Sequence, residues 1–173
     1  SMKDDGAYIS QLRISAIEEM TQEIGFSGIF EFSNMIKFQN LLADAVPVET
    51  ILNNLNLILI KLDSKCYGEM FFSQNLLWKG YKNYGKIWAE AIITDAIKDK
   101  WDSNKLVNLL LSFPSERWLW NLVETADQVV QREFWQKAPV HHHEMILEDI
   151  QYAIRRLLNV RRNFSALCLA SHA

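Results

Sequence analysis

EMILEDIQYAIRRLLNVRR, residues 144–162, carries the clearest helical pattern in the sequence. Residues of one helix face recur at the i, i+3, i+4 and i+7 spacing, and they are Leu147, Ile150, Ile154, Leu157, Leu158 and Arg161. Acidic residues stand at the start of the stretch and arginines at its end, which suits the helix macrodipole at both termini. The pattern therefore predicts a helix over residues 144–162.

Helical spacing of apolar residues continues through most of the chain and predicts about eight helices. Besides 144–162, they are expected at residues 7–23, 28–44, 48–63, 68–83, 86–99 and 103–112, and from Ser115 through Val123 with a continuation or restart at Asp127. Gly25 and Gly85 are expected to end helices, because glycine at a helix C-terminus adopts the left-handed conformation at little cost. We expect an all-α fold of antiparallel helix pairs, stacked as a short α-solenoid or an irregular helical bundle.

The apolar positions also predict which helix faces lie in the core. Three expected core stripes are Ile9, Leu12, Ala16 and Met20; Ile29, Phe32, Ile36 and Leu41; and Ile87, Ala91 and Ile92. Residues 51–62 leave little of a helix circumference polar. The helix at 48–63 should therefore be buried on most sides.

The composition favours a folded chain without a strong general charge. Hydrophobic residues make up 49% and charged residues 23% of the 173 residues, with six Gly and three Pro, unlike a disordered chain. The length suits a single helical domain over 1–173, with residues 1–6 as a disordered, tag-derived start. The net charge of −3 provides no global positive field, so nucleic acid or an anionic membrane would need a local patch.

Cys66 and Cys168 stand far apart in the sequence and form no CxxC spacing. We expect buried, reduced thiols and hence a cytoplasmic location. The opening residues lack the apolar region of a signal peptide, and the apolar tract 57–60 is too short to span a bilayer. No membrane partner is expected.

The chain closes on FSALCLASHA, residues 164–173, an apolar run of helical composition without a polar tail. A helix of this kind needs a partner that covers it. We therefore expect the chain to be a fragment of a longer polypeptide in which further helices follow.

A group of packing residues in the second half of the chain resembles a known architecture. It comprises a corner at Phe113-Pro114, a tryptophan at 118 or 120, the FW pair at 134–135, and the AIRRLL helix followed by a helix of small residues. With these features, residues 106–173 resemble helical-repeat segments, TPR-like or HEAT-like α-solenoids, of large bacterial proteins. The resemblance implies a sensor or scaffold region attached to effector or nucleotide-binding domains, sometimes in antiphage defence. Residues 1–100 lack the same match, and no TPR consensus is satisfied.

His141, His142 and His143 are the obvious candidates for a metal site. Adjacent side chains point in different directions and no HExxH spacing is present, so a site would need ligands from elsewhere. The alternative is a solvent-facing connection before a helix, with Glu144 favourable at its N-terminus. We expect this alternative, with no resident metal and no cofactor, although the run could take up a metal adventitiously in vitro.

All six tryptophans fall between residues 78 and 135. A tryptophan at helical spacing is more often core than recognition, yet aromatic side chains are also enriched at binding hot spots. Trp118 and Trp120 are two residues apart on a helix, so they point about 200° apart. One should pack inward and the other against a neighbouring helix or a partner.

Basic residues gather in two places. The main cluster is Arg155, Arg156, Arg161 and Arg162, and a smaller one combines Lys79, Lys82 and Lys86 with Tyr81 and Tyr84. These side chains could contact phosphates, or the arginines could complement the dipole on a solvated helix end. At the overall charge of this chain we expect the second arrangement.

No P-loop, Rossmann, nucleophile-elbow or paired CxxC motif occurs in the sequence, so we predict no catalytic residue and no enzyme. We expect a non-enzymatic helical scaffold or sensor segment that binds a protein partner or other domains of the same polypeptide. Trp78, Trp120 and Arg156 are the expected partner-contacting residues. The alternative is a helical nucleic-acid-binding module that uses the local basic patches.

Overall fold

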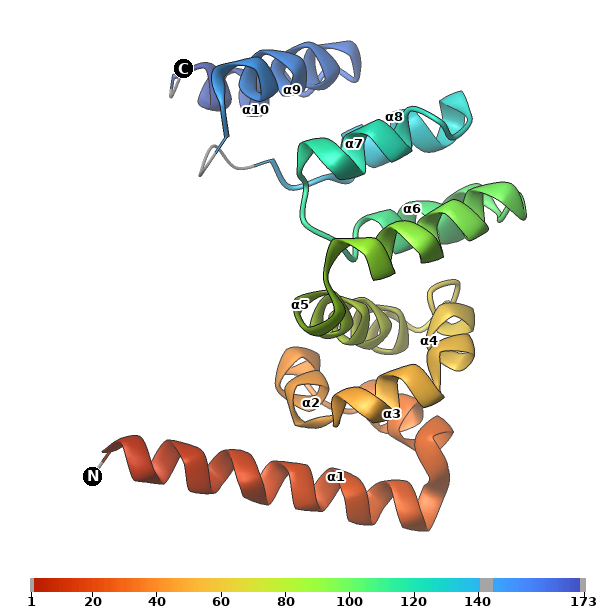
Figure 1. Cartoon of the computed structure of the whole chain (residues 1–173), viewed down its shortest axis with the longest axis vertical. Helices are drawn as coiled ribbons and strands as arrows, with labels where there is room; N and C mark the ends of the chain where they lie inside the picture. The colour runs from red at the N-terminus through yellow and green to blue at the C-terminus, as the bar shows by residue number, and fades with distance from the viewer. Residues whose placement is uncertain (1, 141–144, 172–173) are drawn as a thin grey trace. The chain divides into compact units, whose positions relative to one another are not determined.

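The structure is a computed structural model that describes residues 2–140 and 145–171, in which ten helices and no strand are assigned. The helices are α1 (Met2–Ser33), α2 (Gln39–Ala45), α3 (Val48–Asn53), α4 (Leu55–Lys61), α5 (Tyr67–Lys98), α6 (Ser103–Leu110), α7 (Arg117–Val123), α8 (Gln128–Lys137), α9 (Leu147–Asn159) and α10 (Asn163–Ala170) (Figure 1). The all-α prediction is confirmed.

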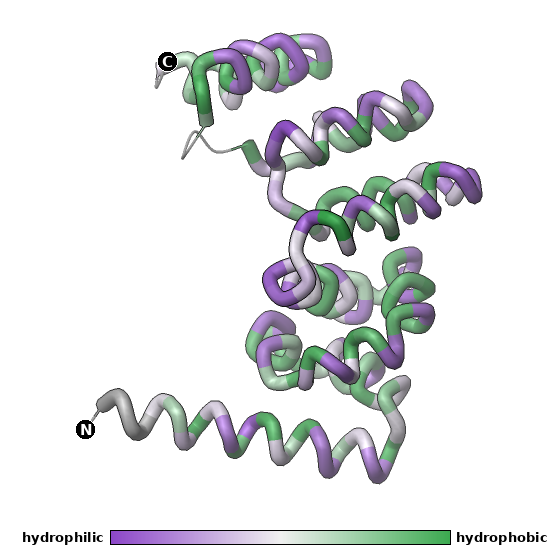
Figure 2. Tube along the Cα trace, viewed as in Figure 1, coloured by the Kyte–Doolittle hydropathy of each residue, from purple (hydrophilic) through white to green (hydrophobic). Residues whose placement is uncertain are grey.

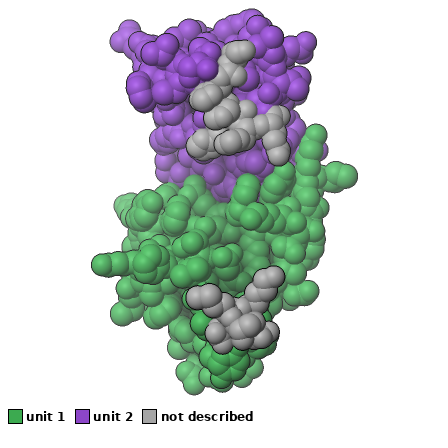
Figure 3. Space-filling model, turned by 90° about the vertical axis from the view of Figure 1, so that its left-hand side faces the viewer, with its two compact units in different colours: residues 1–89 green, residues 90–173 purple. Residues whose placement is uncertain are grey.

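The chain divides into two compact units, residues 1–89 and residues 90–173 (Figure 3). Unit 1 contains α1 to α4 and most of α5, and unit 2 contains the end of α5 and α6 to α10. Each unit is described below by itself. The solenoid arrangement, the single domain over 1–173 and the disordered start at 1–6 stay predictions.

Gly25 and Gly85 interrupt α1 and α5, as the sequence predicts. Gly25 has φ 72 and ψ 166, and Gly85 has φ 76 and ψ −172. This region of backbone space is essentially confined to glycine, because a Cβ clashes with the neighbouring peptide groups. Each glycine therefore joins two helical segments directly, with no connecting loop.

The core of unit 1 centres on the contact between the second segment of α1 and the first segment of α5. Phe30 and Phe72 are both fully buried and meet edge to face with ring centroids 5.1 Å apart. Gly68 permits the close approach, because a Cβ there would lie 2.7 Å from the carbonyl oxygen of Ser33. Asn34 Oδ1 accepts a hydrogen bond from the backbone N–H of Glu69 at 3.1 Å, which fixes the start of α5.

Lys79 ties α5 to the end of α2. Its ammonium group donates to the carbonyl oxygen of Asp44 at 2.7 Å and also reaches the carbonyls of Ala43 and Val46. A cation at a helix C-terminus is favourable, because the last carbonyls lack intrahelical donors. Burial lowers the pKa of Lys79, and the charges of Asp44 and Glu49 partly oppose that shift.

Two predicted helices are broken in the structure. The segment predicted over 28–44 ends at Ser33, and residues 34–38 form turns before α2 begins. The segment predicted over 48–63 divides at Asn54, whose φ of −115 and ψ of 17 are not helical. Figure 2 shows the crowded hydrophobic residues of α4 that made one long buried helix look plausible. Only one side of this segment is buried: Ile51, Ile58 and Leu62 are inaccessible, while Leu52 and Ile60 are exposed.

Several core assignments made from periodicity are wrong. Ile17 lies in the core of α1, whereas the predicted stripe residues Ile9, Leu12 and Ala16 are exposed. In the later helices Leu41, Ile87 and Ala91 are likewise exposed. Apolar spacing identifies a helix, but it does not identify which of two apolar arcs meets a neighbour. The two cysteines are also exposed, free thiols rather than buried ones.

Unit 2 packs α6 against α8, and α8 against α7 and α9. Leu109, Leu119, Val130 and Phe134 lie in this core with at most 1% of their surface exposed. Aspartates begin two of the helices: Asp102 Oδ1 accepts from Asn104 N, and Asp127 Oδ1 accepts from Val130 N, both at 2.9 Å. These caps satisfy N–H groups that have no intrahelical partner. The predicted restart at Asp127 is therefore correct.

Candidate interaction surface

Three aromatic rings from α7, α8 and α9 form one cluster in unit 2. The rings of Trp120 and Tyr152 are stacked with centroids 5.7 Å apart and an interplanar angle of 13°. Trp135 contacts both of them, at 5.4 Å from Trp120 and 6.1 Å from Tyr152. The indole N–H of Trp120 donates to Ser115 Oγ at 3.0 Å. The cluster joins the three helices, and the buried indole N–H of Trp120 keeps a hydrogen-bond partner within it.

Charged side chains surround the outer ring of this cluster. The guanidinium carbon of Arg117 lies 4.2 Å from the centroid of the Tyr152 ring, and that of Arg156 lies 5.2 Å from it. Glu124 accepts hydrogen bonds from the Tyr152 hydroxyl and from Arg156. Arg117 pairs with Asp149 at 3.3 Å. These contacts give the surface a fixed pattern of charge, which suits recognition more than it adds stability.

The structure separates the roles of the three predicted partner-contacting residues. Trp120 is fully buried, so it is a core residue and the expectation that it contacts a partner is wrong. Arg156 retains 32% of its side-chain surface and lies on the rim of the same cluster. Trp78 belongs to unit 1, where it is 37% exposed, stacked with Tyr81 and approached by Lys82 Nζ at 5.3 Å. Trp78 and Arg156 stay predicted contact residues.

The four arginines of the main basic cluster do not act as one patch. Arg162 donates to the carbonyl oxygens of Trp135 and Ala138, at 3.1 and 2.6 Å, and so caps the end of α8. Arg156 is held by Glu124. Arg155 and Arg161 are exposed, and within the described residues no ion pair joins either to a carboxylate. Only these two are available to an anionic partner.

An apolar groove lies between α9 and α10. Its lining residues are Ile154, Leu158, Asn163, Ala166, Leu167 and Ala170. Two of its leucines face solvent, with Leu158 50% and Leu167 68% exposed, and the neighbouring Phe164 is 79% exposed. An uncovered group of large apolar side chains of this kind is typical of a binding surface.

The helical pattern of α9 did not predict this groove, because it assigns all apolar residues of the helix to one core face. At 100° per residue, Ile150, Ala153 and Leu157 lie on one arc, and they are buried. Leu147, Ile154 and Leu158 lie on a second arc that starts about 40° away. The two arcs adjoin, so the sequence does not mark where the core face of α9 ends and the groove face begins.

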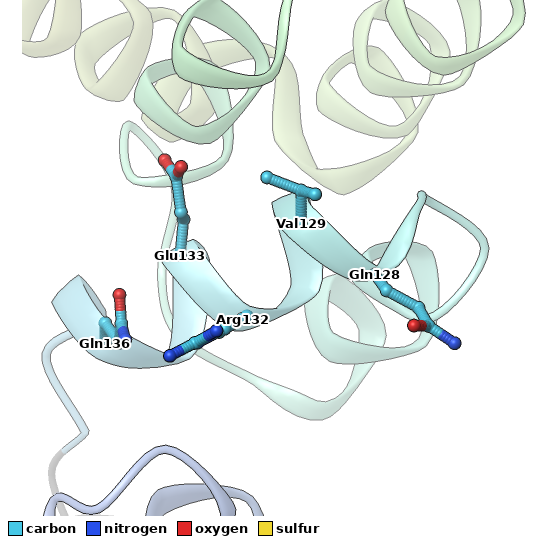
Figure 4. A pocket seen from close by; sticks show the side chains of 5 residues that line it. All are labelled: Gln128, Val129, Arg132, Glu133 and Gln136. Carbon is cyan, nitrogen blue, oxygen red and sulfur yellow. The ribbon is translucent and has the colours of Figure 1, made fainter.

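A shallow hollow also lies on α8, in unit 2. It is lined by Gln128, Val129, Arg132, Glu133 and Gln136 (Figure 4). All five side chains come from one helix, and Figure 4 shows them pointing in different directions. They do not converge on a common point, so the hollow presents no group of ligands for a small molecule.

The expected histidine connection, His141 to His143, lies outside the described residues. Within residues 2–140 and 145–171, no three His, Cys, Asp or Glu side chains come together as a metal-binding group. In the same part of the chain, none of the helices combines the length and the apolar character that crossing a membrane requires.

No protein-family model, curated protein or solved structure matches this chain.

Proposed function

We propose that this chain is a non-enzymatic helical scaffold or sensor segment that binds a protein through the groove between α9 and α10. The observation that carries the proposal is the exposure of Leu158 and Leu167, which line the groove from opposite helices, with Phe164 exposed one turn before Leu167 on α10. Burying such side chains against a partner removes apolar surface from water, at about 25 cal/mol per Å². We further propose that the segment works within a larger bacterial protein in the cytoplasm.

The supporting contacts are those that keep the groove rigid. Ala166 and Leu169 of α10 and Leu157 of α9 are buried, and α9 packs closely on α10. Arg162 anchors the turn between these helices to the end of α8. A surface that is already ordered loses little conformational entropy when a partner binds. The nucleic-acid alternative is less favoured, because Arg156 is paired with Glu124 and Arg162 is bound to backbone carbonyls at the end of α8.

Site-specific photo-crosslinking tests the proposal in cells that produce the protein at its native level. A photoreactive residue at position 167 should give a discrete crosslinked species, because Leu167 is a lining residue of the groove. The matched control places the same residue at position 60, since Ile60 is 62% exposed on α4 and lies outside the groove. Equal labelling at both positions, or none at 167, would contradict the proposed binding face.

A further inference from the structure

We propose that the groove between α9 and α10 takes the first segment of α1 from a second copy of this chain, so that copies associate head to tail. The inference rests on the proposed function, because it names the partner of the same groove. Two exposed faces, one in each unit, carry it.

The first face is a stripe along α1. Tyr8, Ile9, Leu12 and Ala16 are exposed, and at 100° per residue they fall within an arc of about 100°. Ile17, which is buried, lies about 80° beyond the edge of that stripe. α1 therefore uses one face for the core of unit 1 and presents a second apolar face to solvent, as a helix that enters a groove does.

The charges around the two faces are opposite. Glu19 and Glu23 are exposed and fall on the same arc of α1 as Tyr8 and Leu12. Arg155 and Arg161 are exposed next to groove residues, Arg155 beside Ile154 and Arg161 two positions before Asn163. This complementarity selects α1 of another copy over a basic or neutral helix.

The two faces are different surfaces, so the contact is heterologous and each copy keeps one unused face after a single contact. The apolar residues provide the affinity, and the charges orient the helix in the groove. The associated fraction should rise with protein concentration. The affinity should fall when salt screens the carboxylates and guanidinium groups.

Analytical ultracentrifugation of the full chain over a concentration series tests the inference. The wild-type chain should form species larger than a monomer. Leu12→Glu breaks the α1 face and Leu167→Glu breaks the groove, and each alone should weaken association about tenfold or more. A mixture of the two variants should form a dimer and nothing larger, because one intact groove and one intact α1 face remain. Ile60→Glu should associate like the wild type.

A monomeric wild-type chain at every concentration would overturn the inference. So would association that Leu167→Glu leaves intact, or a mixture of the two variants that stays monomeric. If the chain is monomeric and position 167 crosslinks to a different protein, that result would contradict a second copy as the partner. It would still support the proposed function.

Discussion

The start of α5 approaches the end of α1 so closely that a side chain on Gly68 would meet the carbonyl oxygen of Ser33 at 2.7 Å. Asn34 Oδ1 would lie equally close, and both atoms belong to a fixed turn. A Cβ cannot be placed there unless the backbone moves. The glycine is required by packing and not by its own dihedral angles.

Gly68→Ala should therefore destabilise the protein by about 1 to 3 kcal/mol, despite the better helix propensity of alanine. Chemical denaturation monitored by circular dichroism measures the loss. Gly6→Ala is the matched control, because nothing lies within 4 Å of a Cβ at position 6 of the same kind of helix. A neutral Gly68→Ala variant would show that α1 and α5 are not packed in this way.

Gly80→Ala should cost less than Gly68→Ala. A Cβ at position 80 would lie 2.5 Å from Cη2 of the Trp88 ring, which is the far end of a side chain with two rotatable bonds. The indole can turn away, whereas the carbonyl of Ser33 cannot. Combining Gly80→Ala with Trp88→Leu should recover part of the loss, and equal penalties at positions 68 and 80 would contradict this explanation.

A substitution at Gly85 should reveal the cost of backbone strain alone, because an added Cβ meets no neighbouring atom. Its φ of 76 and ψ of −172 suit glycine, and nothing lies within 4 Å of a Cβ built there. Gly85→Ala should destabilise by about 1 to 3 kcal/mol from strain alone. A D-alanine introduced by semisynthesis should leave the stability unchanged or raise it, because D-residues favour the mirror-image region. Equal effects of the two enantiomers would refute the assigned conformation.

Truncation of Trp120 should destabilise the protein far more than truncation of Trp78. Trp120→Ala removes a fully buried ring from the α7–α8–α9 cluster and should cost about 3 to 5 kcal/mol. Trp78→Ala, on a partly exposed ring, should cost markedly less and leave the helicity intact. Thermal melts of both variants measure the difference. A Trp120→Ala variant of native stability would contradict the burial of Trp120 in the core.

Glu69 predicts a specific pH dependence. Burial alone would raise the pKa of this carboxyl, but hydrogen bonds from Ser64 and Lys61 and the charge of Lys61 outweigh burial and lower the pKa. The folded pKa thus lies below the unfolded one. The resulting stabilisation is complete above the unfolded pKa, near 4.5, and is lost as the pH falls through the folded pKa.

Denaturation at a series of pH values measures this effect. Glu69→Gln should flatten the acid limb of the stability profile. Glu18→Gln is the control, because Glu18 is an exposed carboxylate on α1. If both variants keep the wild-type slope below pH 5, the Lys61–Ser64–Glu69 contacts do not stabilise the fold.

The sequence by itself determined that the chain is helical and where several helices break. Apolar residues at helical spacing recur throughout, and Gly25, Gly85 and Asp127 carry local backbone preferences that need no tertiary partner. These preferences act over a few residues, so a short stretch of sequence is enough to predict where such a helix begins or ends.

The tertiary structure alone decided which apolar face is core. The structure buries Ile17 and exposes Leu12, although both residues are apolar, and it likewise buries Leu157 and exposes Leu158. Only the position of a neighbouring helix separates the members of each pair. Tyr152 likewise gave no signal in the sequence, because its contacts with Trp120, Arg117 and Glu124 join residues 28 to 35 positions apart. Contacts between distant residues depend on how helices pack, and a one-dimensional pattern carries no record of that packing.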